Sequence, residues 1–203
     1  PFLKSNHELA PYFCPLEEAL QQDVVTFHTA LSDSGLHPTY HMVGLELLSM
    51  LKTGAILINA SRGEVIDNCA LDNFLLLRPD VSVALDVWEN EPEINLLLLN
   101  KVQIATPHIA GYSLNGKLNG TSKIYEEFSR FFSLADSSFA QERKKNTLKI
   151  DSEVEPNDCI NKAILSAYPI TNDFIDFDKK DLPQIAIHFD ALRNDYKFRK
   201  EFK

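Results

Sequence analysis

Four short apolar runs, each followed by polar residues, divide the first half of the chain. They cover residues 23–27, 55–58, 81–85 and 102–105. Runs of this length that are rich in Val and Ile are typical of strands buried on both faces of a sheet. The sequence therefore predicts four buried strands.

Segments with helical spacing separate the strands, and we expect helices over residues 16–20, 43–51 and 70–77. The apolar stripe of the second helix would consist of Val43, Leu47, Met50 and Leu51. Asp67 and Asn68 stand where the N-cap of the third helix is expected. Strands that alternate with helices indicate βαβ units, so the predicted class is α/β with a partial doubly wound, Rossmann-like parallel sheet.

The pattern changes after Tyr112. A helix is predicted over residues 124–134, preceded by Gly116, Gly120 and Thr121 and with Phe128, Phe131 and Phe132 on one side. Residues 135–146 are mostly polar and charged, which is typical of a linker. The predicted domains are therefore 1–134 and 147–203. In the second, α+β domain we expect a strand at 147–150, a helix near 156–167 and an amphipathic helix over about 182–202.

Composition and charge exclude several classes of function. The net charge of −9 argues against a nucleic-acid binder, because such proteins need a basic surface. No apolar run approaches the roughly 20 residues of a membrane-spanning helix. Cys14, Cys69 and Cys159 form no CxxC pair, so we expect packing residues in a reducing cytoplasm and no metal site.

Polar residues follow all four predicted strands. These segments are residues 28–29, 59–63, 86–92 and 106–111. Ligands of parallel α/β sheets bind beyond the carboxyl ends of the strands. The four segments are therefore predicted to form one site.

Three residue types in these segments suit the oxidation of a 2-hydroxy acid by hydride transfer. His108 could accept the hydroxyl proton, and Glu91 could orient the imidazole and stabilise its charged form. Arg62 offers forked donors for the substrate carboxylate and the developing carbonyl. Taken singly, the Arg could be a surface ion-pair partner, the His a structural residue, and Glu89 with Glu91 a polar turn. Their occurrence at successive strand ends favours the catalytic interpretation.

Three segments also carry a family resemblance. Residues 58–63 (INASRG), 85–92 (LDVWENEP) and 106–111 (TPHIAG) resemble the signature segments of the D-isomer-specific 2-hydroxyacid dehydrogenases. The resemblance implies that Arg62 binds and polarises the substrate, and that His108 is the acid/base with Glu91 as its partner. It also implies that NAD is the cofactor, with contacts from Thr29, Ala60, Ser61, Arg62, Asp86 and Gly111.

Two further segments resemble one branch of that family. They are residues 111–117 (GYSLNGK) with Gly120 and Thr121, and residues 189–196 (FDALRNDY) with Arg199, Glu201 and Phe202. The branch has an extra C-terminal dimerisation domain, so the resemblance implies a homodimer. It also implies oxidation of 4-phospho-D-erythronate to the 2-oxo acid in pyridoxal 5′-phosphate biosynthesis, with Tyr112 contacting the substrate. Another D-2-hydroxy acid, such as phosphoglycerate, and a non-catalytic NAD-fold or dimerisation fragment remain the alternatives.

The phosphate-cradling GxGxxG of the family is not in this sequence. The chain begins at Pro1 without Met, and we expect a longer parent protein that also contains the substrate domain, rather than a complete small protein that lost its cofactor site. Without the cradle, the backbone N–H and helix-dipole contacts that anchor the pyrophosphate are missing. The 203-residue chain alone is therefore expected to bind NAD weakly or not at all and to aggregate.

Overall fold

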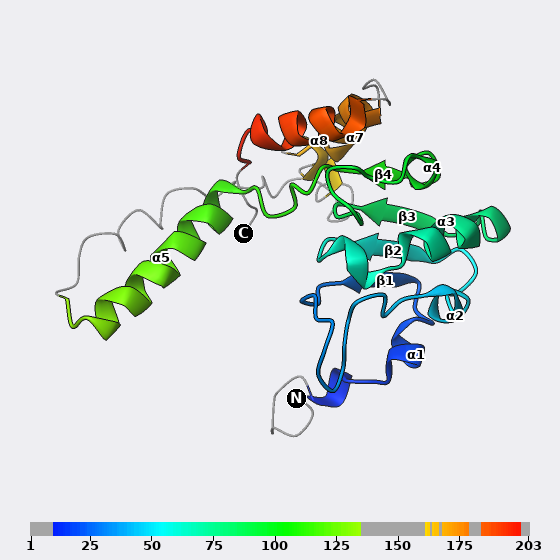
Figure 1. Ribbon diagram of the computed structural model, residues 1–203, viewed down its shortest axis with the longest axis horizontal. Coiled ribbons are helices and arrows are strands. Elements are labelled where there is room, and N and C mark those ends of the chain that lie inside the picture. The colour runs from blue at the N-terminus through cyan, green and yellow to red at the C-terminus, as the bar shows by residue number, and fades with distance from the viewer. Residues whose placement is uncertain (1–9, 135–160, 163, 167, 179–183, 200–203) are drawn as a thin grey trace.

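A four-stranded parallel sheet forms the centre of the chain (Figure 1). The computed structural model describes residues 10–134, 161–162, 164–166, 168–178 and 184–199. The strands lie in the order β1 (Val24–Phe27), β2 (Ile56–Asn59), β3 (Ser82–Leu85) and β4 (Ile104–Ala105). All three pairings are parallel, and the last residues of the strands are aligned with one another. The segments that follow the strands therefore emerge at one edge, as the sequence predicts.

Short helices precede and connect the strands. The 3-10 turn η2 (Ala10–Tyr12) and α1 (Leu16–Ala19) precede β1, and the connections contain α2 (Leu45–Leu48), the 3-10 turn η3 (Gly63–Val65), α3 (Asn68–Leu77) and α4 (Leu96–Leu99). The predicted start of α3 is confirmed, because the Asp67 side chain accepts a hydrogen bond from Ala70 N at 2.9 Å. The α/β class with a parallel sheet is likewise confirmed.

The sheet buries one face in this region, and the prediction of strands buried on both faces is wrong for β1 and β2. Burial alternates along these strands: Leu57 is fully buried, whereas Val24 and Ile56 are 53% and 42% exposed. The buried face belongs to a core with α2 and α3, to which Leu48 and Leu71 contribute. An apolar strand can leave one face exposed, because its composition does not show whether helices cover one face of the sheet or both.

Two predicted helices have different bounds in the structure. The segment predicted as 43–51 is helical only over α2, because Val43 forms a bridge with Ile66 instead of a helical turn. The helix predicted from residue 124 begins at residue 114 and forms α5 (Leu114–Phe131), which extends away from the sheet (Figure 1). The Ser113 side chain caps it by accepting from Gly116 N at 2.9 Å. Gly116 and Gly120 are helical despite their low propensity, which the sequence prediction did not expect.

The C-terminal helices lie beside β4 (Figure 1). They are α7 (Ile170–Asp178), which was not predicted, and α8 (Ile185–Asn194). The helix predicted over 182–202 ends at residue 194, and Arg199 then forms a parallel bridge with Ser113. Residues 161–162 and 164–166 are helical, as predicted for the segment near 156–167. The predicted linker and the strand at 147–150 lie outside the described residues.

Two remaining expectations can be compared with the structure. Cys14 and Cys69 are exposed free thiols, so the expectation of packing residues is wrong for them, and Cys159 lies outside the described residues. No helix in the described part of the chain combines the length and the apolar character needed to cross a membrane.

Neighbouring residues of β2 test the one-sided burial. Leu57→Ala is expected to lower the free energy of unfolding by about 2–5 kcal/mol, because it leaves a cavity in the core. Ile56→Ala on the exposed face should cost less than about 1 kcal/mol. Urea unfolding followed by the fluorescence of Trp88, the single Trp of the chain, measures both. Equal losses in the two variants would contradict the assigned burial.

Candidate active site

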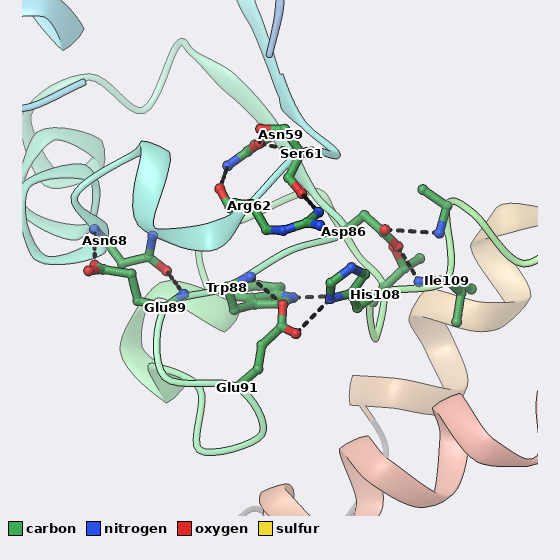
Figure 2. Close-up of polar contacts among 12 residues, drawn as sticks. Asn59, Ser61, Arg62, Asn68, Asp86, Trp88, Glu89, Glu91, His108 and Ile109 are labelled. Atoms are coloured by element: carbon green, nitrogen blue, oxygen red, sulfur yellow. Dashed lines mark hydrogen bonds and ion pairs between the residues drawn. The ribbon is translucent and has the colours of Figure 1, made fainter. Parts of the chain in front are cut away.

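The candidate site is built from the loops that follow β2, β3 and β4 (Figure 2). Arg62 comes from the first loop, Glu91 from the second and His108 from the third. Parallel alignment of the strand ends brings these loops to one edge of the sheet. The three side chains therefore lie on neighbouring loops.

His108 and Glu91 form the central pair. The imidazole Nδ1 lies 2.7 Å from Glu91 Oε2, and Glu91 Oε1 accepts a hydrogen bond from Trp88 N at 2.8 Å. Both side chains are partly buried, with exposures of 27% and 18%. His108 has φ +56°, a left-handed conformation that is uncommon for a residue other than glycine and that surrounding contacts have to hold. The expected contact between the two side chains is thus present.

Asp86 connects the end of β3 to the loop that carries His108. Its Oδ1 accepts hydrogen bonds from Thr106 Oγ1 at 2.7 Å and from Ile109 N at 2.8 Å. Its Oδ2 accepts from Ala110 N at 2.9 Å. A buried carboxylate requires such donors to compensate for lost solvation. Oδ2 has a further lone pair, so the expected contact of Asp86 with NAD, as an acceptor from the nicotinamide carboxamide, is compatible with this arrangement.

The loop after β2 is shaped by the buried side chain of Asn59. Its Oδ1 accepts from Ser61 N and Ser61 Oγ at 3.1 and 2.8 Å, and its Nδ2 donates to Arg62 O at 2.9 Å. Arg62 Nη1 donates to Ser61 O at 2.6 Å. Figure 2 shows the Arg62 side chain running from the end of β2 toward the loop of His108. Most of the guanidinium donors therefore remain for a ligand.

Gly63 allows the first and second loops to approach each other. A Cβ at this position would lie 1.9 Å from Trp88 C and 2.0 Å from Trp88 O, which are backbone atoms. Only glycine fits this contact without displacing one of the two loops. The residue that follows Arg62 thus determines how closely Arg62 and the loop of Glu91 approach.

A second polar cluster surrounds Glu89, in the same loop as Glu91, and the sequence did not predict it. The His41 imidazole contacts Glu89 Oε1, and its Nδ1 lies 3.8 Å from Asp67 Oδ2. Glu89 Oε2 accepts from Asn68 N at 2.7 Å, while Glu89 N donates to Asn68 Oδ1 at 3.3 Å. Glu89 is therefore more than part of a polar turn, because it fixes the loop of Glu91 to the start of α3.

Among the described residues, His41, Asp67 and Glu89 form a group whose possible ligand atoms lie within 4.8 Å of one another. Each carboxylate already has a structural role: Asp67 caps α3, and Glu89 binds Asn68 N. These hydrogen bonds account for the cluster without an ion. The sequence signal that could have revealed it is the position of Glu89 just before Glu91 in the loop.

The residues predicted to contact NAD occupy three places. Four of them, Thr29, Ala60, Ser61 and Arg62, line one hollow of about 440 Å³ beyond the carboxyl ends of β1 and β2. Ala60 and Asp86 also line a crevice of about 150 Å³, which continues toward Tyr168 and Arg199. Gly111 is exposed beside His108. The two hollows share Ala60, and both are lined by small and polar residues, so together they offer a concave site for a ligand.

Tyr112, predicted to contact the substrate, lies among C-terminal side chains. Its ring is 4.5 Å from Lys117 Nζ and packs near Phe198 and Tyr196, with centroid separations of 5.9 and 6.1 Å. Burial raises the pKa of Tyr168 far above its ordinary value, and hydrogen bonding with Tyr196 and Asp173 raises it further. Burial also raises the pKa of Tyr196. These phenols are thus neutral hydrogen-bonding groups, and the predictions from sequence did not include them.

Residues 2–110, more than half of the chain, match the family model described as the D-isomer specific 2-hydroxyacid dehydrogenase, NAD binding domain. The chain belongs to this family. Erythronate-4-phosphate dehydrogenase of Pseudomonas entomophila (strain L48) is 41% identical over 201 residues, covering 94% of this chain and 52% of the relative. The chain thus spans about half the length of the curated relatives it matches.

Two solved structures show the same fold. The NAD-complexed D-isomer specific 2-hydroxyacid dehydrogenase of Lactobacillus delbrueckii ssp. bulgaricus aligns with a TM-score of 0.54 at 24% identity, over 66% of this chain and 46% of that one. The D-lactate dehydrogenase of Aquifex aeolicus, complexed with NAD and lactic acid, aligns with a TM-score of 0.50 at 25% identity, over 66% and 49%. The family match and these neighbours confirm the Rossmann-like class and NAD as the cofactor of the family.

Gly63 offers a direct test of the loop contact. Gly63→Ala is expected to destabilise the chain by about 1–3 kcal/mol, because the added methyl group overlaps the backbone of Trp88. Gly120→Ala is the matched control, since a Cβ there meets nothing within 4 Å and alanine is the better helix former by about 1 kcal/mol. Urea unfolding measures both. A Gly63→Ala chain as stable as the control would show that the two loops do not make this contact.

Proposed function

We propose that the intact protein containing this chain oxidises 4-phospho-D-erythronate at C2 to the 2-oxo acid in pyridoxal 5′-phosphate biosynthesis. The single observation that carries the proposal is the His108–Glu91 pair at 2.7 Å, held beside Arg62 at the carboxyl edge of a parallel sheet. Membership of the family supports the reaction class. The names of the relatives support the substrate.

His108 acts as the base in this reaction. Because Glu91 accepts a hydrogen bond from Nδ1–H, the free lone pair of the neutral imidazole is on Nε2. Nε2 accepts the proton of the C2 hydroxyl while C2 loses a hydride and the C2–O bond becomes a carbonyl. Glu91 then stabilises the imidazolium that has formed.

Arg62 binds the substrate carboxylate and polarises the oxygen on C2. Its guanidinium is anchored by one hydrogen bond to Ser61 O, which leaves further N–H donors in a fixed fork. A carboxylate and a neighbouring developing carbonyl match that fork. Arg62 therefore orients C2 while His108 removes the proton.

NAD supplies the acceptor of the hydride when it is bound. Thr29, Ala60, Ser61 and Arg62 would hold it along the hollow at the ends of β1 and β2, and Asp86 would hold it in the crevice that shares Ala60 with that hollow. Gly111 is proposed as a further contact. The pyrophosphate-binding GxGxxG is not part of this sequence, so the residues present fit one end of the cofactor. Contact of Tyr112 with the substrate belongs to the same proposal.

The proposed domain organisation follows the resemblance. Residues 1–134 are proposed as the C-terminal part of the NAD-binding domain, residues 135–146 as a linker and residues 147–203 as part of a dimerisation domain. The intact protein is accordingly proposed to be a homodimer in the cytoplasm. The family-model match to residues 2–110 supports the first of these assignments.

Substitution of the pair tests the proposed reaction. In the intact protein, His108→Ala and Glu91→Gln are each expected to lower kcat for 4-phospho-D-erythronate by about 100-fold or more, because general-base catalysis is lost or impaired. Binding of NAD, measured by calorimetry, should persist. Glu127→Gln on the exposed surface of α5 is the control and should leave kcat unchanged.

Three results would contradict the proposal. Unchanged turnover in His108→Ala would remove this residue from the mechanism. Faster turnover of phosphoglycerate than of 4-phospho-D-erythronate by the wild-type protein would retain the reaction class but replace the proposed substrate. A wild-type protein that binds NAD but turns over neither acid would favour the non-catalytic alternative.

A further inference from the structure

The loop that carries His108 is held from two opposite sides. On one side the Asp86 carboxylate accepts hydrogen bonds from the backbone N–H groups of Ile109 and Ala110. On the other side the Arg199 guanidinium donates to the carbonyl oxygens of the same two residues, through Nη1 to Ile109 O at 3.1 Å and through Nη2 to Ala110 O at 2.8 Å. An anion and a cation thus bind the N–H and C=O groups of the two residues that directly follow His108.

The backbone of Arg199 adds to this attachment. Leu114 N donates to Arg199 O at 2.8 Å, and Arg199 N donates to Tyr112 O at 3.4 Å. These bonds form the parallel bridge between Ser113 and Arg199. The C-terminal segment therefore holds the end of the loop and the start of α5, as well as the two carbonyl groups next to His108.

The guanidinium itself is held in place by aromatic side chains. Its Cζ lies 4.4 Å from the centroid of the Tyr168 ring, and Nη1 lies 3.5 Å from Tyr196 Oη. Tyr196 Oη in turn donates to Asp173 Oδ2 on α7 at 3.1 Å. Stacking on a ring fixes the plane of a guanidinium, which determines the direction of its donors. Arg199 is thus oriented from the C-terminal unit.

A hollow borders the loop that carries His108, although the side chain of Ile109 is buried. Its volume is about 630 Å³, and Pro107, Ile109 and Arg199 are among the residues that line it. Side chains that face a cavity lose the dispersion contacts that would otherwise hold a loop. The polar contacts of Asp86 and Arg199, together with the buried side chain of Ile109, therefore hold the conformation of His108, with φ +56°.

We infer that Arg199 is a positioning residue, which holds His108 in register with Glu91 and makes the catalytic geometry depend on the C-terminal unit. The inference rests on the proposed function for its catalytic part. Lysine cannot replace arginine at this position, because one ammonium group cannot reach two successive carbonyl oxygens in the geometry of a planar fork. Removal of the side chain takes one donor from each carbonyl group and leaves Ile109 O with Tyr112 N alone, which allows the imidazole to shift relative to Glu91 and Arg62.

The test combines a measurement of the loop with a measurement of turnover. In the intact protein, Arg199→Met is expected to lower kcat by about 100-fold, the effect of a displacement of about 1 Å at a catalytic group. The KM for NAD should change by less than about threefold, because the hollow at β1 and β2 is not altered. Arg199→Lys should recover only a small part of the lost kcat. Arg130→Met is the matched control, because Arg130 is an exposed residue of α5 that pairs with Glu127.

Hydrogen exchange monitors the loop independently of turnover. In the intact protein, the amides of Ile109 and Ala110 should exchange about tenfold faster in Arg199→Met than in the wild type, while the amides of β2 and β3 exchange at wild-type rates. Failure of the wild-type protein to oxidise 4-phospho-D-erythronate would remove the proposed function alone. The exchange result would still decide whether Arg199 holds the loop.

Four outcomes would overturn the inference. Unchanged exchange in Arg199→Met would show that Arg199 does not hold the loop. Faster exchange with unchanged kcat would show that catalysis does not need the contact. Loss of protection from hydrogen exchange throughout the sheet in both Arg199 variants would contradict a local role for this side chain. Full activity of Arg199→Lys would show that the forked guanidinium is not needed.

Discussion

The buried carboxylate of Asp86 is the interaction on which the site depends. It connects the end of β3 to the loop after β4 by three hydrogen bonds, two of which come from the backbone beside His108. A charged group in a buried position costs several kcal/mol unless its lone pairs are used, so the donors have to remain in place. The carboxylate thereby fixes the path of the loop after β4, and with it the position of the His108 imidazole.

The other elements of the site are arranged around that connection. Gly63 permits the loop of Arg62 to lie against the backbone of Trp88, and Glu91 is anchored to Trp88 N in the same loop. Glu89 fixes this loop to the start of α3. The site is thus pre-organised by backbone contacts, which is how a parallel sheet can hold groups from distant parts of the chain in one place.

The sequence predicted the sheet and the central pair well because both depend on local or strongly constrained patterns. The strands are short apolar runs, and the pair of Glu91 and His108 comes from polar residues at successive strand ends. Burial on both faces was predicted wrongly, because an apolar run does not show which face a helix covers. The early start of α5 was missed because Gly116 and Gly120 lower helix propensity, whereas the Ser113 cap compensates only in the folded chain. The roles of His41 and Arg199 depend on contacts between residues that are far apart in the sequence.

The central claim is that C2 of a 2-hydroxy acid loses a hydride while His108 takes the hydroxyl proton. It is tested most directly by supplying the intact protein with NAD and 4-phospho-D-erythronate deuterated at C2, and by measuring the deuterium content of the reduced nicotinamide by mass spectrometry. Hydride transfer from C2 should place one deuterium in the reduced nicotinamide for each turnover, and the rate should be lower than with the undeuterated acid when the transfer step limits turnover. Product that forms without deuterium in the nicotinamide would contradict it.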